Sequence, residues 1–377
     1  MNFSLSEEQE MLRKMARDFF VKELPKSLVR EMVKDEKGYP SELWRKMADL
    51  GWMGLILPDK YNGLGMSFLD LVILLEEMGR ACLPGPFFST VILGSLPVLK
   101  AGDEEQKREI LPKVASGDLI LTLALTEPSA KYTPDGITLK VSRDKGGYVI
   151  NGIKLFVPDA HVADKMVVVT RTRKSSSPEE GITLFLVDNH SPGISCNKLV
   201  TMAGDKQCEV VFDKVKVGEK NMLGEPSKGW EYIAELLPKA AVAKCAEMVG
   251  IAQQALELAV SYSKERVQFD RPIGSFQILQ HYMADMAIYV DGCRFITYEA
   301  AWMMSQGLPY SKQAAVAKAW VSKACLKITS LAHQVHGTIS FTDDHDMALY
   351  TKRAKEAELA FGDDHFHLET IAQGMGL

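Results

Sequence analysis

The spacing of apolar residues changes twice along the chain and divides it into three segments. Up to about residue 120, apolar side chains recur every three to four positions, which indicates helices. Between residues 121 and 224, short runs alternate apolar and polar positions, as half-buried strands do. The helical spacing returns from residue 225 to residue 377. The pattern predicts an α+β protein with an N-terminal helical domain at 1–120, a β domain at 121–224 and a C-terminal helical domain at 225–377.

Helix-start signals place the elements of the first segment. Ser6 fits a capping box with Gln9, and Ser67 precedes an apolar run over residues 68–78 that is typical of a buried helix. A further helix is expected from Ser41, and a short one between residues 102 and 117. The inner faces are predicted to carry Met11, Met15 and Phe19 on the first helix and Leu43, Met47 and Leu50 on the second, with Pro112 and Gly117 closing the last.

Six short apolar runs in the second segment predict strands. They cover residues 121–125, 137–141, 148–150, 166–170, 182–187 and 210–217, and Gly-Gly, Asn-Gly and Pro-Gly pairs supply turns between them. Regular short strands at this spacing are typical of an antiparallel barrel or sandwich.

The third segment opens with a helix after Pro226 and is rich in small residues. Ala241, Cys245, Met248, Ala252, Ala255 and Ala259 form a stripe that permits close helix approach. Long helices are expected at about 275–305, 309–336 and 345–373, which completes an antiparallel four-helix bundle.

Composition narrows the class of protein. The chain has 377 residues and a formal charge of −5, which argues against nucleic acid or an anionic membrane surface as a partner. Six scattered cysteines without C-x-x-C spacing are typical of free thiols in a reducing compartment. The acidic amphipathic N-terminus fits neither a signal peptide nor a presequence, and no apolar run approaches the ~20 residues of a membrane span. We expect a cytoplasmic protein.

A stretch from Tyr262 to Gln277 combines charged and aromatic residues. Tyr262, Arg266 and Phe269 are spaced i, i+4, i+7 and would share one face of a helix. That helix is predicted to end just before Pro272, because proline lacks an N–H and restricts the residue before it. A cation beside an exposed aromatic ring can hold a phosphate and a planar base. The simpler interpretation is a surface arginine over a packed phenylalanine.

The same stretch resembles the signature of the acyl-CoA dehydrogenase family, R-x-x-F-G-x-x-I followed by an aromatic residue or His and then Gln. The matching residues are Arg266, Phe269, Asp270 in place of Gly, Ile273, Phe276 and Gln277. The resemblance covers nearly the whole chain and implies the family's order of helical domain, β domain and four-helix bundle. It implies that Arg266, with Phe269, Phe276 and Gln277, binds the FAD of a neighbouring subunit, and hence an oligomer.

Three further segments resemble family motifs that contact FAD. Leu125 and Thr126 begin an L-T-E-P run, and Phe156 and Val157 follow N-G-I-K, where the family places a Trp over the flavin. Gln334, Val335, His336 and Gly337 resemble a Q-x-x-G segment that contacts the adenosine half of a neighbour's FAD. The chain departs from the family at loop 129–133 and at Pro158, which replaces a Thr. Taken singly, a β-turn before core residues and a helix C-cap also explain these segments.

The catalytic base of the family is absent from both of its usual positions. The resemblance implies removal of an α-proton from an acyl thioester by a Glu, with hydride transfer to the flavin. Phe361, followed by Gly362, occupies the main position of that Glu, and Ala240 occupies the alternative position. Asp363 is the carboxylate nearest in sequence and is a candidate base, although it holds a position that the family gives to a Thr.

Acidic and histidine clusters at 343–346 and 363–367 could also suggest a metal site. His365 and His367 are two residues apart and point away from each other on a helix, which favours a solvated acidic helix end instead.

The missing Glu and the Gly362-Asp363 to His367 pattern resemble subunits of bacterial dehydrogenases for steroid, cyclic or aromatic-derived acyl-CoAs. The resemblance implies an FAD-dependent acyl-CoA dehydrogenase with an acyl-CoA substrate and an electron-transfer flavoprotein as acceptor. The chain would act as a homo-oligomer or as a heteromer with a related chain. The alternatives are a non-catalytic, flavin-holding subunit and a flavin hydroxylase or reductase on the same fold.

Overall fold

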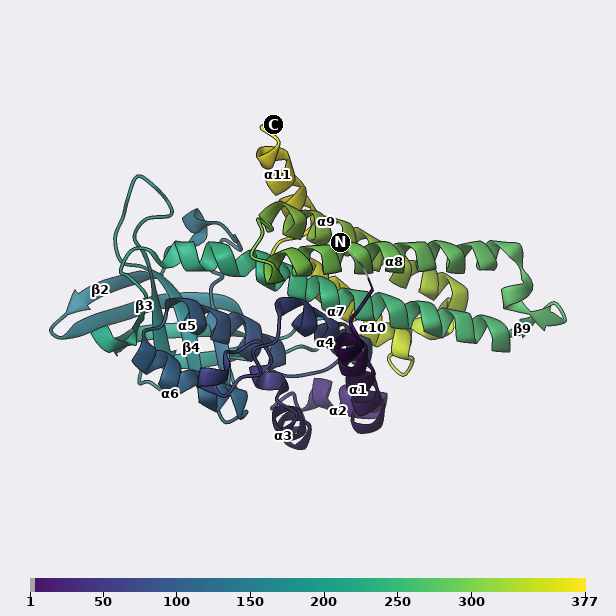
Figure 1. The fold of residues 1–377 in the computed structure, drawn as a ribbon, viewed down its shortest axis with the longest axis horizontal. Helices are drawn as coiled ribbons and strands as arrows, with labels where there is room; N and C mark the ends of the chain where they lie inside the picture. Colours follow the sequence, from purple (N-terminus) through teal and green to yellow (C-terminus); the bar gives the residue numbers. More distant parts are fainter. Residues whose placement is uncertain (1–3) are drawn as a thin grey trace. The chain divides into compact units, whose positions relative to one another are not determined.

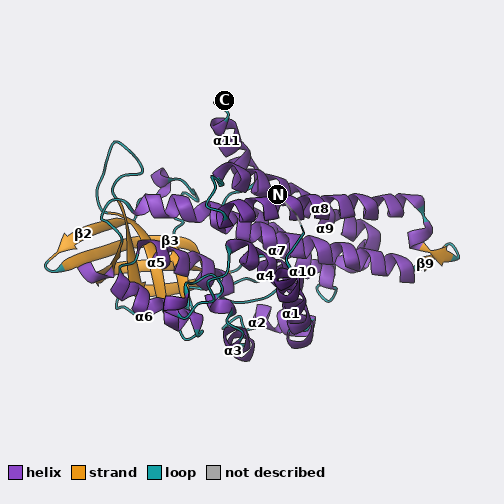
Figure 2. Cartoon of the chain, in the orientation of Figure 1, coloured by secondary structure: helices purple, strands orange, loops and turns teal. Residues whose placement is uncertain are grey.

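The computed structural model describes residues 4–377. Helices dominate, and the strands gather in one sheet apart from a short hairpin at β9 (Figure 2). Contacts within the chain define two compact units. We call the first, made of the chain up to Arg30 with Ser67–Leu83 and Pro238–Leu377, the bundle unit, and the second, made of Glu31–Met66 and Pro84–Leu237, the sheet unit.

The bundle unit begins with α1 (Glu7–Glu23), the start of α2 (Lys26–Lys34) and α4 (Phe68–Ala81). The predicted capping box of Ser6 and Gln9 starts α1, and α4 starts after Ser67 as predicted, with a capping box of Ser67 and Asp70. The predicted inner stripe of α1 was wrong by one residue, since its buried residues are Leu12, Ala16 and Phe20. Met11 is 70% exposed, because α4 packs against the neighbouring stripe of α1.

Long helices form the rest of the bundle unit (Figure 1). They are α7 (Gly229–Glu265, in this unit from Pro238), α8 (Gln277–Ser305), α9 (Ser311–His336), α10 (Asp346–Leu359) and α11 (Asp364–Gly374). The helix predicted at 345–373 is therefore two helices. It breaks at Phe361 and Gly362, which both have positive φ angles, 58° and 95°.

The small-residue stripe of α7 is fully buried, as predicted. Two glycines show how closely the helices approach. A Cβ added at Gly250 would lie 1.9 Å from the carbonyl oxygen of Glu76 in α4, and one at Gly79 would lie 2.0 Å from that of Glu247 in α7. No larger residue fits at either position without separating α4 from α7.

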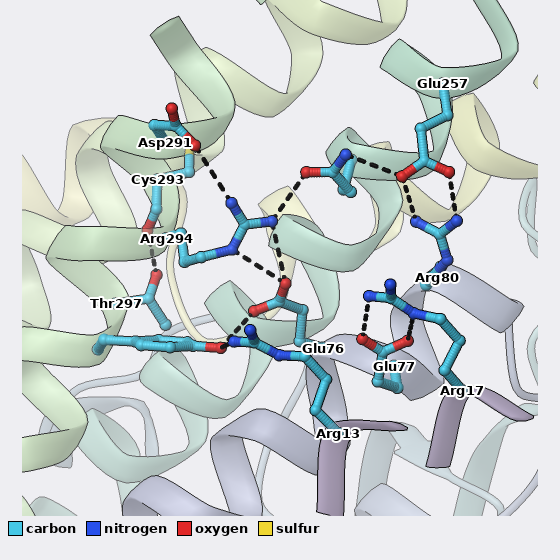
Figure 3. A network of polar contacts seen from close by, with 12 residues as sticks. Arg13, Arg17, Glu76, Glu77, Arg80, Glu257, Asp291, Cys293, Arg294 and Thr297 are labelled. Atoms are coloured by element: carbon cyan, nitrogen blue, oxygen red, sulfur yellow. Dashed lines mark hydrogen bonds and ion pairs between the residues drawn. The ribbon is translucent and has the colours of Figure 1, made fainter. Parts of the chain in front are cut away.

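A network of buried carboxylates and guanidinium groups ties α4 to its neighbours (Figure 3). Glu76 accepts hydrogen bonds from Arg294 Nε at 3.1 Å and from the Tyr298 hydroxyl at 2.7 Å. Glu77 accepts both Arg17 Nε, at 3.0 Å, and Arg17 Nη2, at 2.7 Å. Such pairing makes burial of the two α4 carboxylates tolerable, because an unpaired buried charge is very costly. The network extends to Arg13, Arg80, Gln253 and Glu257.

Two of the predicted helices lie in the sheet unit, with two corrections, and a third helix there, at residues 95–101, was not predicted. The helices of this unit include α3 (Ser41–Asp49), α5 (Ser95–Ala101) and α6 (Glu104–Ala115). Leu43 and Met47 of α3 are buried, but Leu50 follows the end of α3 and is 37% exposed. The prediction that Pro112 closes this helix was wrong, since Pro112 lies inside α6, which continues to Ala115.

The described part of the sheet unit contains one eight-stranded sheet with the order β6-β7-β3-β2-β4-β5-β8, and β1 pairs with β4. Most neighbours are antiparallel, as predicted, while β1–β4 and β2–β4 are parallel. The strands are β1 (Leu121–Ala124), β2 (Lys140–Asp144), β3 (Gly147–Pro158), β4 (Lys165–Arg171), β5 (Ile182–Asp188), β6 (Ile194–Leu199), β7 (Gln207–Gly218) and β8 (Met222–Leu223). The prediction missed β6 and β8. One continuous core, centred on residues such as Ile150, Val168, Phe185 and Phe212, fills the sheet's inner face.

Within residues 4–377, none of the helices combines the length and the apolar character needed to cross a membrane.

Candidate functional site

A buried ion pair in the sheet unit joins two of the motifs predicted to contact FAD. Lys154, in the N-G-x-K motif, donates from Nζ to Glu127 Oε1 at 2.7 Å and to the Leu125 carbonyl at 2.8 Å. Lys154 is fully buried and Glu127, in the L-T-E-P motif, is 3% exposed. The ion pair therefore fixes the end of β1 against β3.

Glu127 also orders the loop that follows its own motif. Its carboxylate accepts hydrogen bonds from the backbone N–H groups of Thr138 and Leu139 and from the Thr138 hydroxyl. Burial acts to raise the pKa of Glu127, but the Lys154 ammonium and these donors outweigh burial and lower it. Burial lowers the pKa of Lys154 to about 8, against the opposing effect of Glu127. The contact between them has the geometry of an ion pair.

Phe156 stands on an irregular part of β3. The register between β3 and β7 shifts between Lys154 and Val157, and Phe156 has a φ of 54°. Left-handed backbone is unfavourable for a bulky residue and is a mark of functional sites. Phe156 is 50% exposed, whereas Leu125, Thr126 and Val157 are buried. The bulge thus presents an aromatic ring beside buried supporting residues.

The stretch after α7 differs from its prediction. The helix ends at Glu265, so Arg266 and Phe269 do not share a helix face with Tyr262. Residues 267–268 and 271–272 form the hairpin of β9 (Val267–Gln268) and β10 (Arg271–Pro272). The two residues between them, Phe269 and Asp270, have φ angles of 54° and 60°, as in the type I′ turns of tight hairpins.

This hairpin exposes the predicted cofactor residues. Phe269 is 84% exposed and contacts the ring of Phe276 edge to face, with centroids 6.0 Å apart. Arg271 lies 4.2 Å from the centroid of Phe276. Arg266 and Gln277 are also exposed. Contact of this hairpin with FAD or with another chain stays a prediction.

The Q-x-x-G segment lies at the end of α9. Gln334 is exposed, while Val335 and His336 are buried. His336 stacks on Tyr262 of α7, with ring centroids 4.7 Å apart. Gly337 forms the C-cap with a φ of 70°, so the C-cap interpretation is correct for the backbone. Contact of this segment with FAD stays a prediction.

The two positions where the family's base is expected both lie in the bundle unit. Phe361 is half-buried in the turn between α10 and α11, and Ala240 is fully buried in α7. Asp363 is the N-cap of α11 and accepts a hydrogen bond from the Phe366 N–H at 2.9 Å. Any role of Asp363 as a base therefore competes with this cap.

The acidic clusters have structural partners. Arg30 donates to the carbonyls of Asp343 and Asp344 and pairs with Asp346. His365 is exposed and His367 is buried, as expected for residues two apart on a helix. No set of three or more His, Cys, Asp or Glu within residues 4–377 could hold a metal ion.

The chain is similar over nearly its whole length to known proteins. Models of the acyl-CoA dehydrogenase N-terminal, middle and C-terminal domains match residues 6–118, 122–215 and 227–376. The solved structure of butyryl-CoA dehydrogenase from Megasphaera elsdenii is 30% identical, with a TM-score of 0.93 and coverage of 100% of both chains. The caffeyl-CoA reductase-Etf complex subunit CarC from Acetobacterium woodii is 32% identical over 90% of each chain.

A second solved structure is a complex of two named chains. The match to the ChsE4-ChsE5 complex from Mycobacterium tuberculosis is 26% identical, with a TM-score of 0.91, and covers 100% of this chain and 99% of that one. The predicted α+β architecture is thereby confirmed. With three consecutive domain models and full-length relatives in agreement, the chain belongs to the acyl-CoA dehydrogenase family.

Proposed function

We propose that this protein is an FAD-dependent acyl-CoA dehydrogenase, or one subunit of a heteromeric one, that works without a base at the family's usual positions. Family membership supports the reaction class. The absence of a base is inferred from Phe361 and Ala240, which occupy those positions, since neither side chain can accept a proton.

The residues of the chain suit FAD. Phe156 offers an exposed aromatic face, and the buried Glu127–Lys154 pair makes the strand end at Leu125 and Thr126 rigid. Arg266 and Gln277 supply exposed polar groups beside the hairpin for a neighbouring subunit's cofactor. Bound FAD would supply the hydride acceptor for α,β-dehydrogenation of an acyl thioester.

The turn at Phe361 provides only part of the chemistry. A dehydrogenase must polarise the thioester carbonyl and remove the α-proton. The Phe361 backbone N–H can donate to the carbonyl, whereas its side chain has no basic atom. The proton acceptor must come from elsewhere, and a related chain with the family's Glu is the simplest source. The match to a two-protein complex supports this proposal.

Replacement of Arg266 by Ala is expected to strip flavin from the purified protein. A charge-assisted contact to a phosphate contributes about 1.5–3 kcal/mol, roughly a 10- to 100-fold change in affinity. The measurement is FAD released per chain on denaturation. Lys264→Ala is a matched control, because Lys264 is an exposed cation at the same end of α7. A fully flavinated monomer would contradict binding across a subunit boundary.

Co-expression with a related acyl-CoA dehydrogenase chain is expected to give an active complex. The complex should reduce an artificial electron acceptor when an acyl-CoA is added, because the partner supplies the missing carboxylate. An electron-transfer flavoprotein is the proposed natural acceptor, which the match to a subunit of an Etf complex supports. Turnover by this chain alone at ordinary rates, about 1–1000 per second, would show that no partner is needed.

Two alternatives have distinct outcomes. A flavin-holding subunit without catalytic function is favoured by Phe361, and such a subunit would leave all catalysis in the partner's own site. A flavin hydroxylase or reductase would show flavin reduction by NAD(P)H instead of by acyl-CoA. All six cysteines are free thiols, which supports a reducing compartment such as the cytoplasm.

A further inference from the structure

Lys318 of α9 is a fully buried ammonium group that binds backbone oxygens. Its Nζ donates to the Glu358 carbonyl at 2.7 Å, to the Gly362 carbonyl at 2.9 Å and to the Ser322 hydroxyl at 3.2 Å. All three acceptors are uncharged. The Glu358 carboxylate is instead bound by Lys355. Burial lowers the pKa of Lys318, and the hydrogen bonds to these three oxygens offset part of the cost of burying its polar group.

His367 of α11 holds the adjacent carbonyl. Its Nε2 lies 3.0 Å from the Phe361 carbonyl oxygen, so Nε2 carries the proton and donates. Its Nδ1 is buried and has no hydrogen-bond partner within residues 4–377. Burial lowers the pKa of His367 to about 4, so the ring is neutral at physiological pH. One ring nitrogen, Nε2, thus donates to the Phe361 carbonyl, while the other, Nδ1, is left without a hydrogen bond.

Together these two nitrogens hold both carbonyls of the turn that carries the base position. Phe361 and Gly362 have φ angles of 58° and 95°, and the first is unfavourable for a phenylalanine. A Cβ at Gly362 would lie 2.4 Å from Phe366 Cδ1 and 3.1 Å from His367 Nε2. The turn is thus fixed by donors on α9 and α11 and by close packing.

Helix capping alone does not account for this arrangement. The Glu358 carbonyl belongs to the last turn of α10, but Phe361 and Gly362 lie beyond its end at Leu359. The bonds to their carbonyls hold the loop, not the helix.

We propose that Lys318 and His367 are positioning residues that hold residue 361 in its left-handed conformation, so that its backbone N–H and side chain face the bound acyl-CoA. This inference rests on the proposed function for the identity of the ligand. The restraint itself is a property of the chain and is tested without flavin.

Amide hydrogen exchange of the flavin-free protein is the first test. His367→Leu is expected to speed exchange in residues 360–367 at least tenfold, while His367→Gln, which keeps an N–H donor, stays close to wild type. His365→Leu is the matched control, because His365 is exposed on the same helix. Lys318→Met should act like His367→Leu, with Lys355→Met as its control. Equal exchange in His367→Leu and His365→Leu would overturn the proposal, whether or not Lys318→Met folds.

Kinetics of the Phe361→Glu variant provide a second test. Adding His367→Leu is expected to lower the rate of flavin reduction at saturating acyl-CoA at least tenfold with little change in the concentration for half-saturation. Adding His367→Gln should preserve the rate. An unchanged rate with His367→Leu would count against positioning. An inert Phe361→Glu variant would count against the proposed function, and the exchange comparison alone would then decide the positioning role.

Discussion

Replacement of Lys154 by Met is expected to destabilise the protein by about 3–5 kcal/mol, because it leaves the Glu127 carboxylate buried without its counter-ion. Lys154 is fully buried, and its ammonium group satisfies both that carboxylate and the Leu125 carbonyl. The strand end at Leu125 and Thr126 would lose its support, so flavin binding should weaken as well. Urea unfolding followed by circular dichroism measures the first effect.

The exposed pair of Lys131 and Asp135 in the neighbouring loop provides the control. Its ion pair is 2.6 Å long, but both side chains are about half exposed. Lys131→Met should therefore lower the free energy of unfolding much less than Lys154→Met does. The double variant Glu127→Gln with Lys154→Met is expected to recover part of the loss, since no unpaired charge remains. Equal losses of unfolding free energy for Lys131→Met and Lys154→Met would show that the buried ion pair contributes no more to stability than the exposed one.

Replacement of Phe361 by Glu is expected to give the chain slow flavin reduction with some acyl-CoA. The variant puts a carboxylate at the position where the family has its base, in a turn already held by Lys318 and His367. Well-placed acid–base catalysis contributes about 10²–10⁴-fold. The increase in the rate of flavin reduction should be near the lower end of this range, because a grafted carboxylate lacks a tuned pKa and supporting contacts. Anaerobic flavin absorbance over time is the measurement.

The Phe361→Gln variant separates the carboxylate from the change of shape. Glutamine is nearly the same size as glutamate but has no basic group, so the Phe361→Gln variant should not gain flavin reduction with acyl-CoA. Rapid bleaching of the wild-type flavin, lost on Asp363→Asn, would instead make Asp363 the base. In that case Asp363 would have to act as a base while it also accepts the hydrogen bond that caps α11.

Elements with a strong local signal could be predicted from the sequence. The capping box at Ser6, the helix start at Ser67 and the small-residue stripe of α7 appear in the structure as expected. These features depend on residues within a few positions of each other. The choice between Met11 and Leu12 as an inner residue of α1 depends on where α4 lies, so it could not be settled locally.

The candidate site was harder to predict for the same reason. The helical spacing of the residues predicted a helix that continued past Glu265, whereas the helix ends there. The turn of the hairpin consists of Phe269 and Asp270, and it lacks the Asn-Gly pair that would have marked it in the sequence. Gly362 alone did not mark the break between α10 and α11, since single glycines occur inside helices.

The burial and pairing of Lys318, Glu127 and Lys154 gave no local signal in the sequence. Lys318 lies in a run of helical residues and has the composition of a surface position, and its partners are 40 and 44 residues away. The pairing of Glu127 with Lys154 spans 27 residues. Only the folded chain shows that these charges are buried.

The most direct test of the account is anaerobic addition of acyl-CoA to the wild-type protein, prepared alone and together with a related chain, with flavin absorbance recorded over time. We expect that the protein prepared alone binds FAD and that acyl-CoA shifts its spectrum without bleaching it, because Phe361 and Ala240 cannot take the α-proton. The joint preparation should bleach. Bleaching of the chain alone at ordinary rates, about 1–1000 per second, or the absence of flavin from both preparations, would contradict the account.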